Sequence, residues 1–328
     1  MNMKMGLMKT ATGLAALVLA NAAHAQAKWD LPSGYGGNTF QVQNLQHFAD
    51  EVSKATAGKL RITLHPGGAL YKANEIKRAV QSGQTPIGEF ILSGAANENP
   101  LFGVDSVPFL ATGYADSRRL YQASRAAQEK LLAQQGLKVL FSVPWPGQSL
   151  YSVKPVNYAA DLAGTKMRAY NPATTRIAQL LKAQPVTIQL AELPQALATG
   201  AVQNFLTSSA SGVESKLHEQ VKHFYPVSAW LPRNVTVVNL KDFNALDKAT
   251  QDALVKAAAE AEIRGWALSE KLDTEYIGQL KAAGMSINQP NDDVKKALAA
   301  IGETMTTEWI KAAGPEGQAI VDAYRKQP

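Results

Sequence analysis

Short strand patterns alternate with helical patterns along most of this chain. Leu60, Ile62 and Leu64 alternate with polar residues, which predicts a strand, and apolar residues at helical spacing before Gly58 predict a helix. Further helices are predicted at 73–82, 117–135, 174–182 and 192–199, and further strands at 87–92, 137–143, 167–170, 185–188, 202–206 and 235–239. This order predicts an α/β fold with mixed sheets flanked by helices.

The length of the chain predicts more than one such unit. A 328-residue chain exceeds the usual size of a single compact core. The alternation also runs in two series, so we predict a first lobe at 26–150, to which later segments return, and a second lobe at 151–240. Residues 241–328 are predicted to be helical. A helix over 249–283 would be about 50 Å long and could brace both lobes, followed by helices at 292–313 and 316–325.

The first 25 residues have the pattern of a cleavable export signal. Lys4 and Lys9 precede an apolar run over 11–20, and Ala23-His24-Ala25 is a small-x-small cleavage site. The apolar run is shorter than the roughly 20 residues that a spanning helix needs, so cleavage is favoured over an uncleaved anchor. We therefore predict a periplasmic protein whose mature chain does not insert into the membrane.

Composition excludes several classes of partner and of chemistry. The chain has no cysteine, which rules out disulfides and thiolate sites. The net charge of +6 falls to +4 without Lys4 and Lys9. This positive charge suits an anionic ligand, and the sequence has no block of basic residues of the kind that binds nucleic acids.

The histidines do not have the spacing of a metal site. His218 and His223 would point about 140° apart on a helix, a poor geometry for binding a metal. We predict no metal and no cofactor.

Motifs of the common enzyme classes are also absent from the sequence. It contains no nucleophile elbow, zinc-protease motif, phosphate-binding loop or dinucleotide fingerprint. The protein is therefore predicted not to be an enzyme. An active site assembled from distant segments remains an alternative.

Arg168 is the strongest candidate for a binding residue. It shares one face of the predicted strand 166–170 with Tyr170, and Asn171 follows at the strand end. An arginine there can offer two parallel N–H donors to a carboxylate. A surface ion pair would account for it equally well, and spacing alone does not decide between them.

The segments around Arg168 resemble a known family. Three segments in this order carry the resemblance: Gly164-Thr165-Lys166-Met167-Arg168-Ala169-Tyr170-Asn171, then Gln184-Pro185-Val186-Thr187-Ile188, then Glu192-Leu193-Pro194-Gln195-Ala196-Leu197-Ala198-Thr199-Gly200-Ala201-Val202. It is similar to the DctP-type solute-binding proteins of TRAP (tripartite ATP-independent periplasmic) transporters, and the resemblance extends from Trp29 to the C-terminus. It implies a two-lobed periplasmic binding fold in which Arg168 clamps a small organic carboxylate. It also implies membrane transporter subunits as partners.

The resemblance implies further ligand contacts, with departures from the family pattern. Gln148 stands where the family often has a second arginine, and Gln203-Asn204 replace the usual Asp-Gly pair. Thr207 or Ser208 falls where a ligand-contacting asparagine is expected. These substitutions put the identity of the ligand in question more than membership of the family.

Aromatic residues gather near the same segments. Trp145 precedes Gln148, Trp230 lies in a loop that resembles a ligand-contacting stretch, Phe90 is on strand 87–92, and Tyr35 lies in a glycine-rich loop. If the tryptophans line the cleft, the ligand has an apolar or ring portion. Burial of both tryptophans in the core is the alternative.

Two acidic residues lie near the end of strand 87–92. Glu89 and Glu98 could accept a hydrogen bond from a ligand hydroxyl or amine, but solvent exposure is the favoured interpretation for both.

The sequence thus predicts a receptor that captures a small organic monocarboxylate, such as an aromatic or branched 2-oxo or hydroxy acid. The receptor would deliver this acid to a TRAP-type transporter. A ligand-sensing protein of the same fold and a periplasmic enzyme are the alternatives.

Overall fold

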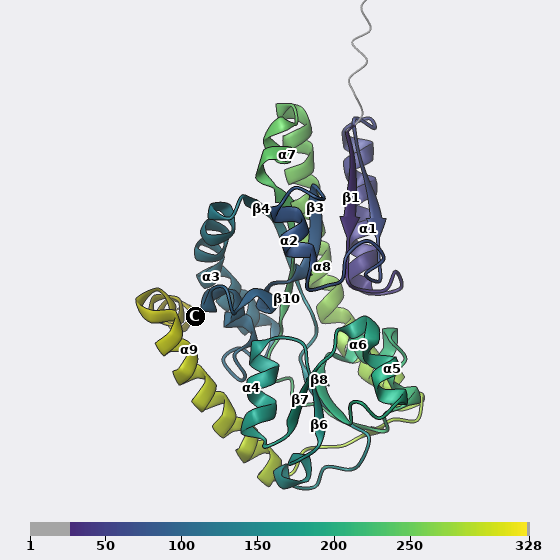
Figure 1. Cartoon of the computed structure of the whole chain (residues 1–328), viewed down its shortest axis with the longest axis vertical. Helices are drawn as coiled ribbons and strands as arrows, with labels where there is room; N and C mark the ends of the chain where they lie inside the picture. Colours follow the sequence, from purple (N-terminus) through teal and green to yellow (C-terminus); the bar gives the residue numbers. More distant parts are fainter. Residues whose placement is uncertain (1–26, 327–328) are drawn as a thin grey trace, which may run out of the picture.

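The computed structural model describes residues 27–326, so the predicted export signal lies outside the described part. The chain forms two α/β lobes with long helices running along both (Figure 1). Within residues 27–326, no helix is both long and apolar enough to cross a membrane.

The first lobe is built on a small parallel pair and a three-stranded antiparallel sheet. Strands β1 (Ala27–Pro32) and β2 (Leu60–His65) are parallel, and β10 (Arg233–Asn239) lies between β3 (Ile87–Ile91) and β4 (Leu137–Pro144). A single parallel bridge between Ser33 and Glu89 joins the two groups. Strand β10 corrects the predicted lobe limits, which assigned it to the second lobe. Its sequence predicts a strand but not the sheet that it joins.

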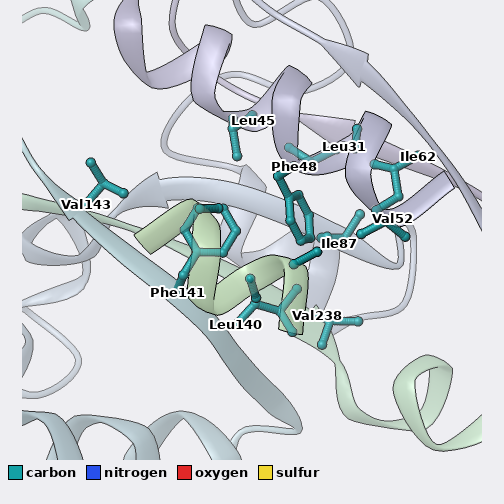
Figure 2. Packing of buried hydrophobic residues seen from close by; sticks show 14 of the residues in the cluster. Leu31, Leu45, Phe48, Val52, Ile62, Ile87, Leu140, Phe141, Val143 and Val238 are labelled. Carbon is teal, nitrogen blue, oxygen red and sulfur yellow. The ribbon is translucent and has the colours of Figure 1, made fainter. Parts of the chain in front are cut away.

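Helices cover this lobe and complete its core. They are α1 (Phe40–Ala55), α2 (Ile76–Gln81), α3 (Tyr114–Gln134), α7 (Leu240–Ala245) and the 3₁₀ turns η1 (Leu92–Ala95) and η2 (Pro100–Ser106). Thr39 caps α1 by accepting a hydrogen bond from the Val42 N–H. Phe48 of α1 meets Phe141 of β4 edge-to-face, with ring centroids 5.1 Å apart (Figure 2).

The second lobe contains a six-stranded mixed sheet. Its strand order is β11-β9-β5-β8-β6-β7. The strands are β5 (Ser149–Ser152), β6 (Lys166–Ala169), β7 (Gln184–Thr187), β8 (Asn204–Thr207), β9 (His223–Tyr225) and β11 (Ser286–Ile287). Strand β6 is parallel to β7 and β8, and β5 is antiparallel to β8 and β9.

Short helices pack around this sheet. They are α4 (Pro172–Leu180), α5 (Leu193–Ala198), α6 (Ser209–Glu214), and the 3₁₀ turns η3 (Ala159–Leu162), η4 (Leu190–Glu192) and η5 (Leu217–Glu219). Helix α4 begins shortly after β6 ends, and Asn171 between them donates a hydrogen bond to Ser93 of the first lobe. The end of β6, with Arg168, therefore lies beside the first lobe.

The long helix α8 (Lys248–Ala282) contacts both lobes, as predicted. In the first lobe Trp266 donates a hydrogen bond to the Ser142 carbonyl, at 3.0 Å between Nε1 and O. In the second lobe Ser209 donates to Asp273 at 2.7 Å. Gly265 lets the helix approach β4, because a Cβ there would lie 2.4 Å from a methyl carbon of Val143. Helix α8 is therefore a brace between the lobes.

Helix α9 (Asp292–Lys326) is a second brace that the sequence did not indicate. Its first half packs Val294 and Leu298 into the core of the second lobe, and its second half packs Trp309 and Val321 against the first lobe. The helix is interrupted at Gly314, whose φ of +64° is left-handed. This break matches the predicted interruption between 313 and 316.

Candidate ligand-binding site

A small cavity lies between the two lobes. It is narrow and partly open, and residues from both lobes and from the segments that connect them border it. Six residues predicted from the sequence lie on its wall: Tyr35, Trp145, Gln148, Arg168, Tyr170 and Thr207. Four others complete the wall: Ile91, Leu190, Ser211 and Pro232. No acidic side chain of the described chain is among these residues.

Arg168 is a buried cation in this cavity. Its side chain is 4% exposed, and its Nε donates to the Ile188 carbonyl at 2.8 Å. The guanidinium carbon lies 4.9 Å from the centre of the Tyr170 ring. Burial lowers the pKa of Arg168 to about 10, which still leaves it charged at neutral pH. Among residues 27–326, no carboxylate forms an ion pair with it, so its charge suits an anion in the cavity.

Gln148 is held in place by its neighbours. Its Nε2 donates to the Pro146 carbonyl at 3.1 Å, and its Oε1 accepts from the Tyr170 hydroxyl at 3.1 Å. The Gln148 backbone also pairs with the strand-like segment that returns to the first lobe, through the Trp230 carbonyl at 2.8 Å. An uncharged amide therefore stands beside Arg168, in a fixed orientation.

Two aromatic side chains form one wall of the cavity. The rings of Tyr35 and Trp145 are 4.9 Å apart at 53°, and Phe40 packs edge-on against Trp145. Both polar ends meet Asn234 of β10: the Tyr35 hydroxyl donates to its Oδ1 at 3.2 Å and the Trp145 indole N–H at 2.9 Å. The wall is thus apolar toward the cavity and hydrogen-bonded behind it.

Trp230 and Phe90 do not lie on this cavity. Trp230 is 1% exposed and belongs to the core between the second lobe and α9, and its indole approaches the hydroxyl of Tyr170 from behind the cavity wall. Phe90 packs between β3 and α2, on the opposite face of β3 from Ile91. It borders a separate, wider opening that shares Ile91 and Tyr170 with the cavity.

Asn171 and Ser208 cap helices instead of lining the cavity. The Oδ1 of Asn171 accepts from the Thr174 N–H at 2.8 Å, and its Nδ2 donates across to Ser93 of the first lobe at 2.9 Å. Ser208 caps α6 by accepting from the Ser211 N–H at 3.0 Å. Both are polar residues between a strand and the helix that follows it, a position that serves helix capping as readily as ligand contact.

Several residues at the site carried no sequence signal of their role. Ser211 and Leu190 belong to no motif. Asn234 ends the 228–234 stretch that resembles a ligand-contacting segment of the family, but nothing singled out its side chain. The two-residue alternation on β3 was the one pattern that could have placed Ile91 at the cavity. Glu89 was expected to face solvent and is instead buried, 2% exposed, behind the aromatic wall. The sequence could not indicate this, because its polar partners are distant in the chain.

Comparison with known proteins agrees with this architecture. The profile of the family described as bacterial extracellular solute-binding protein, family 7, matches residues 34–312. The chain belongs to this family. Its members include TRAP solute-binding proteins, which are solute receptors and not enzymes.

Two solved structures of this kind share much of the sequence. DctP6 of Bordetella pertussis, an extracytoplasmic solute receptor binding pyroglutamic acid, is 48% identical with a TM-score of 0.90. A marine metagenome TRAP solute-binding protein specific for pyroglutamate, solved with the co-purified ligand, is 44% identical with a TM-score of 0.90. Each comparison covers 92% of this chain and 100% of the other.

A more distant relative is the 2,3-diketo-L-gulonate-binding periplasmic protein YiaO of Escherichia coli, 26% identical over 95% of this chain and 94% of its own length. Small organic acids are thus the ligands named for these family 7 relatives. The first-named relatives bind a cyclic acid with one carboxylate.

Proposed function

We propose that this family 7 protein is a periplasmic receptor for pyroglutamate, or for a close analogue, which it delivers to the membrane subunits of a TRAP transporter. Arg168 would bind the carboxylate of the ligand. The observation that carries the proposal is a single buried arginine in a small cavity without acidic groups. The pyroglutamate-binding relatives at 48% and 44% identity support it.

The charge of the cavity favours a ligand with one negative charge. Arg168 supplies one positive charge, and the neighbouring Gln148 supplies none. A second carboxylate would be buried without a counterion, which is costly. This asymmetry favours a monocarboxylate over a dicarboxylate such as glutamate or succinate.

The same cavity disfavours an ammonium group. None of its described lining residues is acidic, and the amide and hydroxyl groups there are neutral. An amino acid with a free ammonium would lose its hydration without gaining an ion pair. In pyroglutamate the nitrogen belongs to a lactam and carries no charge. We therefore propose that the receptor distinguishes the lactam from proline and glutamine by charge.

The aromatic wall fits a ring better than an extended polyol. Tyr35 and Trp145 offer flat apolar surfaces to the cavity. Because Trp230 lies in the core, the aromatic wall contains one tryptophan, Trp145. A compact ring therefore suits the site better than the larger aromatic acids predicted from the sequence.

Thermal shift and calorimetry with four matched compounds test the proposal. L-pyroglutamate should raise the melting temperature, since a ligand that binds only the folded state stabilises it by about 2.7 kcal/mol at 100 times Kd. Pyroglutamide lacks the carboxylate charge, L-proline carries an ammonium, and L-glutamate carries both an ammonium and a second carboxylate. These three should give little or no shift. Stronger binding of proline or glutamate than of pyroglutamate would contradict the proposal.

A further inference from the structure

The aromatic wall is anchored from behind by a chain of buried polar groups. Asn234 receives hydrogen bonds from Tyr35 and Trp145 on its Oδ1 and donates from its Nδ2 to Glu89 Oε1. The other oxygen of Glu89 accepts from the Ser33 hydroxyl at 2.7 Å. All five side chains are at most 8% exposed. Neither Asn234 nor Glu89 borders the cavity itself.

The partners allow only one orientation of the Asn234 amide. The indole N–H of Trp145 can donate but not accept, so it requires the amide oxygen. With the amide oxygen turned toward Trp145, the amide nitrogen faces Glu89 and donates to its Oε1. A flipped amide would set donor against donor at Trp145.

The sheet brings these groups together. Asn234 lies opposite Ile91 in the register of β10 with β3, so Glu89 is its diagonal neighbour on the same face. Ser33 reaches Glu89 through the bridge that joins the parallel pair to the three-stranded sheet. Paired strands therefore hold Asn234 and Glu89, whereas Tyr35 and Trp145 lie in connecting segments.

We infer that Asn234, oriented by Glu89, is a positioning residue that fixes Tyr35 and Trp145 as the aromatic wall of the ligand cavity. Its role in ligand affinity rests on the proposed function. Its role in orienting the indole does not, and can be measured without ligand.

An exchange of the two side-chain types tests this inference. In the variant Glu89→Gln/Asn234→Asp, the new carboxylate still accepts from Trp145 and Tyr35, and the new amide donates to it and accepts from Ser33. The number of hydrogen bonds among these side chains and the single carboxyl group are retained. Asn234→Leu removes the acceptor. Asn239→Leu is the matched control, because Asn239 is a buried amide of the same strand that bonds Val80 and Lys241, away from the cavity.

The first readout is the indole N–H signal of Trp145 in ¹⁵N NMR of the ligand-free protein, assigned with Trp145→Phe. It should stay near its wild-type position in the exchange variant and in Asn239→Leu, and shift upfield with faster solvent exchange in Asn234→Leu. An unchanged signal in Asn234→Leu would overturn the inference. If that variant does not fold, the exchange variant decides: loss of the wild-type signal there overturns it.

The second readout is the Kd for L-pyroglutamate by calorimetry. Asn234→Leu should weaken binding by about 10-fold or more, the size expected when buried donors lose their acceptor. The exchange variant and Asn239→Leu should stay within about threefold of wild type. If Asn234→Leu and Asn239→Leu weakened binding equally, the cause would be general destabilisation of the protein, and the inference would be overturned. Failure of the wild type to bind pyroglutamate would instead refute the proposed ligand, and the NMR signal would still report on the positioning.

Discussion

At the scale of residues, Arg168 is the buried charge on which the proposed ligand binding depends. It is buried with its Nε fixed by Ile188, and no carboxylate of residues 27–326 forms an ion pair with it. Arg168→Ala should weaken pyroglutamate binding by about 100-fold or more, since breaking a buried charge pair costs roughly 3–5 kcal/mol. Arg168→Lys should also bind weakly, because an ammonium cannot form two parallel hydrogen bonds. Calorimetry of folded variants checks this, and wild-type affinity in Arg168→Ala would exclude the arginine from the site.

Glu89 gives a second prediction at this scale, through pH. Burial raises the pKa of Glu89 from 4.5 to about 7 despite hydrogen bonds from Ser33 and Asn234. Between these values the folded state holds a proton that the unfolded state has lost. Stability is therefore full below pH 4.5 and falls as pH rises toward 7, by about 3 kcal/mol for this group.

Glu89→Gln removes that titration. The glutamine Oε1 can still accept from Asn234, and its Nε2 can donate to the Ser33 hydroxyl, which reverses the direction of that bond. Urea unfolding of the ligand-free protein from pH 4.5 to 8 should show a smaller loss of stability in the variant than in the wild type. Glu214, whose pKa burial also raises to about 7, contributes equally to both proteins. Parallel pH profiles for the two proteins would show that Glu89 does not titrate in this range.

The residue scale also shows the limits of the sequence. Arg168, Gln148, Tyr35 and Thr207 could be predicted at the cavity from strand patterns and family resemblance. The sequence could not tell that Trp145 lines the cavity and Trp230 does not. Both lie in connecting segments, where no strand or helix periodicity shows which side chains face the cavity. Glu89 looked solvated because nothing near it in the chain explains its burial.

At the scale of elements, the limits of helix α8 could be predicted from the sequence, but the residues that it contacts could not. The run of residues without helix breakers predicted its limits to within about a residue. The strands β5, β9 and β11 were missed, and β9 and β11 have only three and two residues, too few to show a periodicity. The sheet that β10 joins depends on partners more than 80 residues away.

Two glycines of α8 provide a matched test of the brace. At Gly265 a Cβ would meet Val143 at 2.4 Å and Asn44 at 2.8 Å, whereas Gly278 faces open space. Gly265→Ala should lower the free energy of unfolding by about 1–3 kcal/mol through overpacking. Gly278→Ala should leave it unchanged or raise it by up to about 1 kcal/mol, since alanine favours the helix. Urea midpoints compare them, and equal stability of both variants would contradict the close approach of α8 to β4.

At the scale of the whole molecule, the two long helices α8 and α9 and the connecting segments 145–148 and 226–232 join two lobes that border one cavity. The cavity wall takes Tyr35, Ile91 and Trp145 from the first-lobe side, and Arg168 and Thr207 from the second lobe. A ligand in that cavity therefore touches both lobes. The central claim is that its carboxylate meets Arg168 while its ring lies against the Tyr35–Trp145 wall.

A crystal structure of the protein with L-pyroglutamate tests this claim most directly. The account predicts both carboxylate oxygens within hydrogen-bonding distance, about 3 Å, of the terminal nitrogens of Arg168. It also predicts the lactam ring in contact with Tyr35 and Trp145, and no acidic side chain at the ring nitrogen. Electron density that places the carboxylate away from Arg168, or the ring outside this cavity, would contradict the account.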